Sequence, residues 1–394
     1  MSPLLPFDII ALIIDIVGEN KDTNLLKELA LVSHSFLQIS SKHLFATVDL
    51  HDANPEFHVA SSKKGFIKLF KGRPDVIKYI RQLTYKFEEG YNNSIDHLLS
   101  AILLNFLPTT SRLTSLKICA FYLDWTNLDP SVTSAFRNLM HLPTLNHIDL
   151  SSIRNFPLSS LTSSVNLLRL DIRNSSPSGG HDLGVLSEMT PKIREFHTSE
   201  STWVTTKLLH AKRHDGRPAF NFTDLRQLSI SFISFEDGRN IRYLLQNAKF
   251  LEKLHLSVGL YQGLVGLLSS STRTLKVLDL TLFLPLEGLC EELEAMAGHN
   301  ILEALCLEVL VHASVYDHED EEFIGPIIQN VEKVFVKPGW SALRQVSFKL
   351  KILNTFWLDD CKSFEEALQS LPDKYLSHLS KLESVTLNYS VYFD

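Results

Sequence analysis

The chain has 394 residues, of which 44% are hydrophobic and 21% charged, and its formal net charge is −7. These values are ordinary for a globular protein and allow a large core. The acidic balance argues against nucleic-acid binding, which needs clustered lysine and arginine. The apolar stretch from Ile9 to Val17 is too short to span a membrane. The four cysteines lie far apart, as free thiols of a reducing compartment do, so we expect a cytoplasmic or nuclear protein.

The first fifty residues predict three short helices. Pro6 suits the start of a helix, and Gly18 is expected to end it. Asp22 and Thr23 are candidate caps of the second helix, and Ser33 is expected to cap the third. Apolar residues wrap most of the first helix: Ile9, Ile10, Ile13, Ile14, Ile16 and Val17. Because a bundle of about forty residues cannot bury all of that surface, we expect it to dock on a partner.

The same segment resembles a known family. Leu5-Pro6-x-Asp8-Ile9-Ile10, then Leu29-Ala30-Leu31-Val32-Ser33 and the aromatic Phe36, is similar to the F-box, a three-helix motif that docks on the Skp-type adaptor of cullin-based ubiquitin ligases. The stretch from His43 to Leu50 resembles a variant common in mushroom-forming fungi. Two positions depart from the family pattern, because His34 stands where a basic residue or cysteine is frequent and Phe36 where tryptophan is common.

The resemblance implies that residues 1–50 form an F-box-like domain that binds the adaptor and, through it, a cullin. The implied adaptor contacts are Leu5, Pro6, Ile9, Ile13, Leu29, Val32 and Phe36. The alternative is an ordinary amphipathic cap on the domain that follows. Residues 51–79 are interpreted as a rigid helical joint and cap, with a helix around Phe66 that ends before Pro74.

From Ile80 onward one pattern recurs: an apolar residue, two others, an apolar residue, one other, and an apolar residue. The copies are Ile80-Leu83-Tyr85, Leu113-Leu116-Ile118, Leu145-Ile148-Leu150, Leu167-Leu170-Ile172, Leu225-Leu228-Ile230, Leu251-Leu254-Leu256, Leu275-Leu278-Leu280, Leu302-Leu305-Leu307, Leu343-Val346-Phe348 and Leu382-Val385-Leu387, with a weaker copy at Ile193-Phe196-Thr198. The final apolar pair has the period of a half-buried strand, and helical stretches lie between copies. Val331, Val334 and Val336 also fit, but their surroundings favour a helix.

Strands and helices that alternate at recurring intervals predict an α/β fold with parallel strands. The pattern is typical of a leucine-rich-repeat solenoid, here irregular and spanning residues 80–394 with roughly eleven strands. The polar residues between the apolar pairs would line the concave face of this solenoid and contact a protein target. The candidate target-binding residues are Asp149, Asp171, Arg173, His197, His255 and Asp279. Histidines in such a row could make target binding sensitive to pH. The alternative is a merely solvated sheet face.

Aromatic contact residues are expected at loops and helix ends, for example at Trp125, Trp203, Trp340 or Trp357. The sequence has no nucleophile elbow, phosphate loop, dinucleotide-binding glycine motif, His-Glu-x-x-His or Cys-x-x-Cys. We therefore predict no catalytic, cofactor-binding or metal-binding residues, and a protein that is not an enzyme. Cys306 with His312, and the acidic run from Asp317 to Glu322, are interpreted as structural and not as metal ligands.

The sequence thus predicts a substrate-recognition subunit of a Skp/cullin/F-box-type ubiquitin ligase, with no nucleic acid or membrane among its partners. Such a subunit would perform no bond chemistry and would act by holding the target near the transferring enzyme. Two alternatives stay open: an adaptor-binding scaffold that does not lead to target ubiquitination, and a hydrolase or other enzyme within the solenoid. The sequence does not identify the target.

Overall fold

The computed structural model describes residues 6–51, 62–87, 93–104, 111–178, 189–232, 235–259, 266–268, 273–283, 286, 288–312, 320–353 and 361–393. The chain divides into two compact units. The first comprises Met1–Pro191 and Ala211–Ala219, and the second comprises Lys192–His210 and Phe220–Asp394. In each unit, parallel strands alternate with helices, so the expected α/β class with parallel strands is confirmed. The division into domains 1–50, 51–79 and 80–394 stays a prediction.

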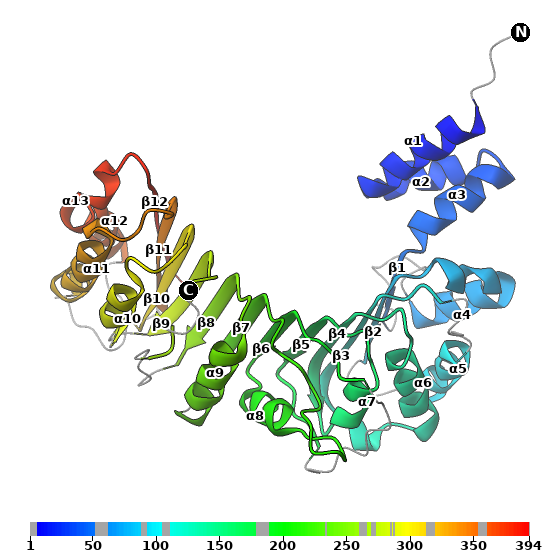
Figure 1. Ribbon diagram of the computed structural model, residues 1–394. Coiled ribbons are helices and arrows are strands. Elements are labelled where there is room, and N and C mark those ends of the chain that lie inside the picture. The colour runs from blue at the N-terminus through cyan, green and yellow to red at the C-terminus, as the bar shows by residue number, and fades with distance from the viewer. Residues whose placement is uncertain are drawn as a thin grey trace, which may run out of the picture. The chain divides into compact units, whose positions relative to one another are not determined.

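The first unit begins with three helices, α1 (Phe7–Glu19), α2 (Thr23–Ala30) and α3 (His34–Leu44) (Figure 1). The expected caps are confirmed. The Asp22 carboxylate accepts a hydrogen bond from the Leu25 amide at 3.1 Å, and the Ser33 hydroxyl accepts one from the Phe36 amide at 3.3 Å. Each cap satisfies an N–H group that the helix itself leaves without a partner. The core of the three helices is small, with Ile14 and Leu26 as its fully buried apolar residues.

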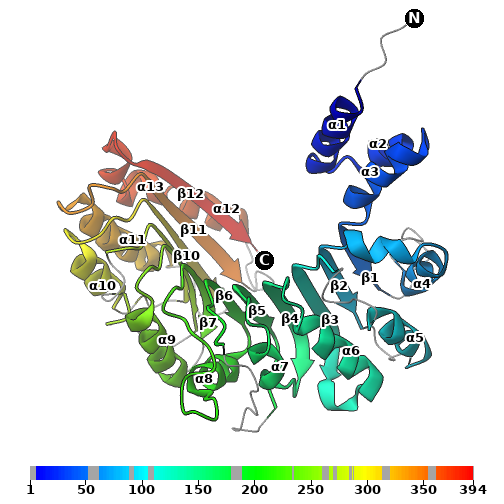
Figure 2. The same cartoon turned by 45° about the vertical axis from the view of Figure 1, so that its right-hand side comes forward.

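The remainder of the first unit is a row of parallel strands with helices on one face (Figures 1 and 2). The strands pair in chain order: β1 (Thr47–Leu50), β2 (Gln82–Lys86), β3 (Ser115–Asp124), β4 (His147–Arg154) and β5 (Arg169–Arg173). The helices are α4 (Lys63–Gly72), the 3₁₀ helix η2 (Pro74–Tyr79), α5 (Asn93–Leu103), the 3₁₀ helix η3 (Trp125–Asn127), α6 (Pro130–Met140) and α7 (Leu158–Thr162).

The second unit repeats this arrangement. Its strands, again parallel and paired in chain order, are β6 (Glu195–Ser199), β7 (Gln227–Phe232), β8 (Lys253–Val258), β9 (Val277–Phe283), β10 (Ala304–His312), β11 (Gln345–Leu353) and β12 (Thr386–Phe393). Its helices are α8 (Thr202–His210), α9 (Phe235–Asn247), α10 (Leu289–Met296), α11 (Asp320–Val336), α12 (Cys361–Gln369), α13 (Leu371–Tyr375) and the 3₁₀ helix η6 (Leu379–Lys381). The segment around Val331 is thus helical, as expected.

The recurring apolar pattern builds the core because equivalent residues lie side by side in register. Leu254 pairs with Leu228 on one side and with Leu278 on the other, and Leu278 pairs with Leu305. All four side chains are buried, as is Leu275, the leading residue of its repeat. Burial of one leucine contributes roughly 1.5–3 kcal/mol, so each repeat is stabilised mainly by its two neighbours.

The first strand of the first unit and the last strand of the second unit differ from expectation. Strand β1 lies within the segment expected to be purely helical, and Val48 of β1 pairs with Leu83 of β2. In β12 of the second unit, Leu387 pairs with Val346 and Tyr389 pairs with Phe348. The sequence pattern had placed Val385 and Leu387 in these two positions. Val385 belongs to the turn before β12, because its amide donates to the Leu382 carbonyl and the strand begins at Thr386. Residues of β12 are only half-buried because this strand has a neighbour on one side.

Candidate partner-binding surfaces

Helix α1 has two apolar stripes on adjacent faces. One stripe, Ile10, Ile14 and Val17, faces the other two helices, with Ile14 buried and its companions half-buried. The other stripe is exposed and consists of Ile9, Leu12, Ile13 and Ile16. Both sets have the spacing of one helical face, so the second stripe is a continuous apolar surface that the described residues do not cover.

A second exposed apolar element lies at the turn between α2 and α3. Leu31 is 87% exposed and Val32 is 65% exposed. Large apolar side chains stabilise a fold by being buried, so these two add little to the free energy of folding. The exposed stripe of α1 together with the Leu31–Val32 turn is called the helical docking surface below.

Charged side chains also join α1 to α3. The Asp15 carboxylate lies 2.6 Å from the Lys42 ammonium and 2.7 Å from Nε2 of His43. Hydrogen bonds from Lys42 and from His43 hold the pKa of Asp15 below its ordinary value, against a smaller effect of burial. The His43 ring lies directly on Gly18, where any Cβ would overlap the ring. Contrary to the expectation from the sequence, Gly18 does not end α1, because the helix continues through Glu19. Its missing side chain instead allows α1 and α3 to pack closely.

The seven residues expected to contact an adaptor fall into three groups. Leu5 lies outside the described residues. Pro6, Ile9, Ile13 and Val32 are exposed. Leu29 and Phe36 are half-buried, which fits a role in holding the helices together as much as a role in contact. Three further exposed residues of the surface, Leu12, Ile16 and Leu31, were not among the adaptor contacts predicted from the motif. Leu12 and Ile16 could have been predicted, because they have helical spacing with Ile9 and Ile13.

The polar face of β3–β5 carries two buried carboxylates, which differs from the solvent-facing row expected at these positions. Asp149 and Asp171 are neighbours in register and both are buried. Arg173 and Lys117 place their nitrogens 2.5 and 3.2 Å from Oδ2 of Asp149. Arg169 lies 3.0 Å from Oδ2 of Asp171. The carboxylates are thus shielded by basic side chains above them.

The rest of this cluster is a histidine and a cysteine. His147 forms hydrogen bonds with Asp171, 2.8 Å from Nε2, and with the Ser115 hydroxyl, 2.9 Å from Nδ1. Cys119 is half-buried, and burial raises the pKa of its thiol. The thiol is therefore protonated near neutral pH, which does not favour a nucleophilic role.

On the polar face of the second unit, the expected residues His197, His255 and Asp279 lie on β6, β8 and β9. His197 of β6 is aligned with Ser229 of β7, and Ser229 with His255 of β8. His255 in turn places Nδ1 3.1 Å from Asp279 of β9. Burial opposes ionisation of Asp279, but the hydrogen bond and charge of His255, together with Cys306 and Lys349, outweigh it, so that the pKa of Asp279 lies below its ordinary value.

The aromatic residues expected to contact a partner are in part buried. Trp125 and Trp340 are core residues, and the Trp340 indole donates a hydrogen bond to the Val334 carbonyl. Trp357 lies outside the described residues, as does the side chain of Trp203. The exposed aromatic pair is Phe121 and Tyr122 instead, with ring centroids 5.0 Å apart. This pair follows Cys119 where the pairing of β3 with β4 is irregular, and Tyr122 has a positive φ of 56°.

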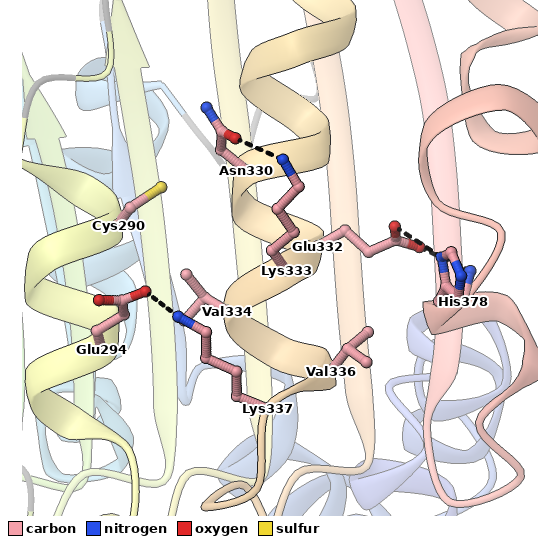
Figure 3. A pocket seen from close by; sticks show the side chains of 9 residues that line it. All are labelled: Cys290, Glu294, Asn330, Glu332, Lys333, Val334, Val336, Lys337 and His378. Carbon is pink, nitrogen blue, oxygen red and sulfur yellow. Dashed lines mark hydrogen bonds and ion pairs between the residues drawn. The ribbon is translucent and has the colours of Figure 1, made fainter.

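A cavity of about 560 Å³ lies between α10 and α11 in the second unit (Figure 3). Cys290 and Glu294 line it from α10, and Lys333 and Lys337 from α11 and its end. Lys337 is paired with Glu294 at 2.5 Å, and burial raises the pKa of the Cys290 thiol. The cavity therefore presents paired charges and a protonated thiol rather than an activated nucleophile.

Among the described residues, no group of three or more histidine, cysteine, aspartate or glutamate side chains is arranged to hold a metal ion. No helix in the described part of the chain combines the length and apolar character that crossing a membrane requires. No protein-family model matches the chain, and no curated protein is significantly similar to it.

Proposed function

We propose that this chain is a target-binding subunit of a Skp/cullin/F-box-type ubiquitin ligase, with α1–α3 as an F-box that docks on the adaptor. The observation that supports this proposal is the helical docking surface, with Ile9, Ile13 and Val32 exposed on a bundle whose own core is small. An exposed apolar patch bordered by polar residues is typical of a protein interface. The motif match and the exposed stripe agree on Ile9 and Ile13.

In this proposal the two rows of parallel strands form a leucine-rich-repeat solenoid that holds the target. The chain contributes proximity, because a held target meets the transferring enzyme at a high effective concentration. No catalytic group is required of it. The polar strand residues, among them Arg173, His197 and His255, are the proposed target contacts. Asp149 and Asp171 are proposed to act indirectly, since they are buried beneath basic side chains.

Adaptor binding is tested by titrating a purified Skp-type adaptor into the full chain in a calorimeter. The variant Ile9→Ser/Ile13→Ser/Val32→Ser removes exposed apolar area and is expected to weaken binding at least 100-fold, because apolar interface residues contribute most of such affinities. A matched control, Leu98→Ser/Leu104→Ser, changes two exposed leucines on and next to α5 and should leave adaptor binding unchanged. Equal binding by the first variant and the native chain contradicts the proposal.

Capture of interacting proteins from cells separates the ligase from the scaffold. Recovery of both adaptor and cullin, with further proteins that accumulate when the proteasome is inhibited, supports a target-binding subunit. Recovery of the adaptor alone indicates a scaffold. Recovery of neither reopens the possibility of an enzyme.

A further inference from the structure

We infer that the polar face of β2–β5 binds an extended acidic segment of a protein target, an inference that rests on the proposed function for its biological meaning. Four basic residues lie on this face: Lys86, Lys117, Arg169 and Arg173. They are called the basic patch below. The chain as a whole has a net charge of −7, whereas these four cations and the three carboxylates paired with them, Asp49, Asp149 and Asp171, sum to +1.

The patch presents cations to solvent and hides the anions that hold them. The side chains of Lys117 and Arg173 are 37% and 46% exposed, whereas the Asp149 side chain between them is 6% exposed. The same relation holds between Arg169, 44% exposed, and Asp171, 8% exposed. An approaching ligand therefore meets ammonium and guanidinium groups before it meets a carboxylate.

The buried carboxylates fix the positions of these cations. Lys117 and Arg173 both contact Oδ2 of Asp149, so their charged groups lie close together above one atom. Oδ1 of Asp149 is buried and has no hydrogen-bond partner among the described residues. A buried polar atom without a partner costs free energy. The arrangement thus favours placement of the cations over stability, which is a common property of binding sites.

The spacing of the basic patch matches an extended peptide. Lys86 and Arg173 lie in one row of the sheet three strands apart, which is about 14 Å at the usual strand separation. Arg169 and Arg173 are four residues apart on β5, or about 13 Å. An extended peptide covers about 13 Å in four residues and turns every second side chain to the same face. Acidic side chains four residues apart would meet successive cations.

A peptide fits the charge pattern better than a nucleic acid does. Asp49 lies at the β1 side of the patch, exposed and 3.2 Å from the Lys86 ammonium. A phosphate backbone carries charge at every nucleotide and would meet this carboxylate, while a peptide places charge only where its acidic residues stand. The exposed pair Phe121 and Tyr122 follows Cys119 of β3, which is aligned with the patch residue Lys86, and offers apolar contact to neighbouring residues of such a peptide.

The inference is tested by fluorescence anisotropy with a labelled twelve-residue peptide that carries glutamate at every fourth position. The comparison probes are the same peptide with glutamine at those positions and a twelve-nucleotide oligothymidine. The key variant, Lys117→Gln/Asp149→Asn/Arg173→Gln, removes the two central cations of the patch without leaving the Asp149 carboxylate buried and unpaired. The control, Arg226→Gln/Glu252→Gln/Lys276→Gln, makes the same three changes in an exposed ion-pair cluster of the second unit.

We expect the native chain to bind the glutamate peptide at least tenfold more tightly than the glutamine peptide, with affinity that falls as salt is added. The key variant should lose at least tenfold and the control should not. Equal binding of the two peptides, or an unaffected key variant, overturns the inference. Tighter binding of the oligothymidine also overturns it and assigns the patch to nucleic acid.

Adaptor titration of the same proteins keeps the two proposals apart. The key variant should bind adaptor as the native chain does, because its changes lie outside α1–α3. If the native chain binds the glutamate peptide but not the adaptor, the ligase assignment fails and the acidic-segment site stands.

Discussion

The buried ion pair between Lys63 and Asp96 gives the sharpest prediction about the stability of the first unit. Both side chains are 1% exposed, and the Lys63 ammonium lies 2.9 Å from Oδ1 of Asp96. The same ammonium lies 4.8 Å from the ring centroid of Tyr85, whose hydroxyl donates a hydrogen bond to Asp96. Three elements, α4, α5 and β2, therefore meet at one charge pair.

Removal of one partner should destabilise this region strongly. Lys63→Met leaves the Asp96 carboxylate buried without its cation, a change that typically costs about 3–5 kcal/mol. The loss of the cation over Tyr85 adds to this cost, since such contacts contribute about 2 kcal/mol when desolvated. The double variant Lys63→Met/Asp96→Asn leaves no buried charge, so we expect it to be more stable than Lys63→Met alone.

Hydrogen exchange measured by mass spectrometry is the suitable assay, because two compact units need not unfold as one transition. We expect Lys63→Met to increase exchange in β2 and α5 between about 100-fold and several thousand-fold. Strands β8–β10 of the same molecules serve as an internal reference. Lys64→Met is the matched control, because Lys64 is the next residue and is exposed. Unchanged protection of β2 in Lys63→Met, or equal effects of both substitutions, would refute the reasoning.

Three further predictions concern other parts of the fold. Gly18→Ala should loosen α1 from α3 and lower the melting temperature, because its Cβ overlaps the histidine ring on α3, while Gly72→Ala, with open space around it, should not. Asp15 has a lowered pKa, so its contribution to the free energy of unfolding is present above its pKa in the unfolded chain, about 4, and is lost as pH falls through its pKa in the folded protein. In a series of melting curves from pH 5 to 2, Asp15→Asn should therefore make stability depend less on pH. Leu278→Ala should cost roughly 2–5 kcal/mol in denaturant unfolding, and Leu387→Ala in half-buried β12 clearly less; equal costs would contradict the proposed difference in packing.

The strand pattern was predictable because burial on a parallel sheet has a period that the sequence repeats. Even β1 carried the signal, since Phe45, Val48 and Leu50 have the same spacing as later repeats. This strand was not predicted, because the segment resembles a three-helix motif. The register of β12 was not predictable, because it depends on where the turn before the strand ends, and Val385 lies in that turn although it fits the apolar spacing.

The candidate surfaces were predictable only where exposure follows from helical spacing. The double stripe of α1 can be read from the spacing of Ile9, Ile13 and Ile16. Burial of Asp149 depends instead on Lys117 and Arg173, which come from neighbouring strands. Such contacts are set by strand register, which one strand's sequence does not specify.

Within each unit, each strand pairs with its neighbours in chain order. Contacts are therefore local in sequence, and loop closure costs little entropy at each step. A strand can find its partner as soon as one further repeat has left the ribosome, without waiting for the C-terminus. Synthesis and folding can thus proceed in the same direction, with the apolar face of only the newest repeat left open at any moment.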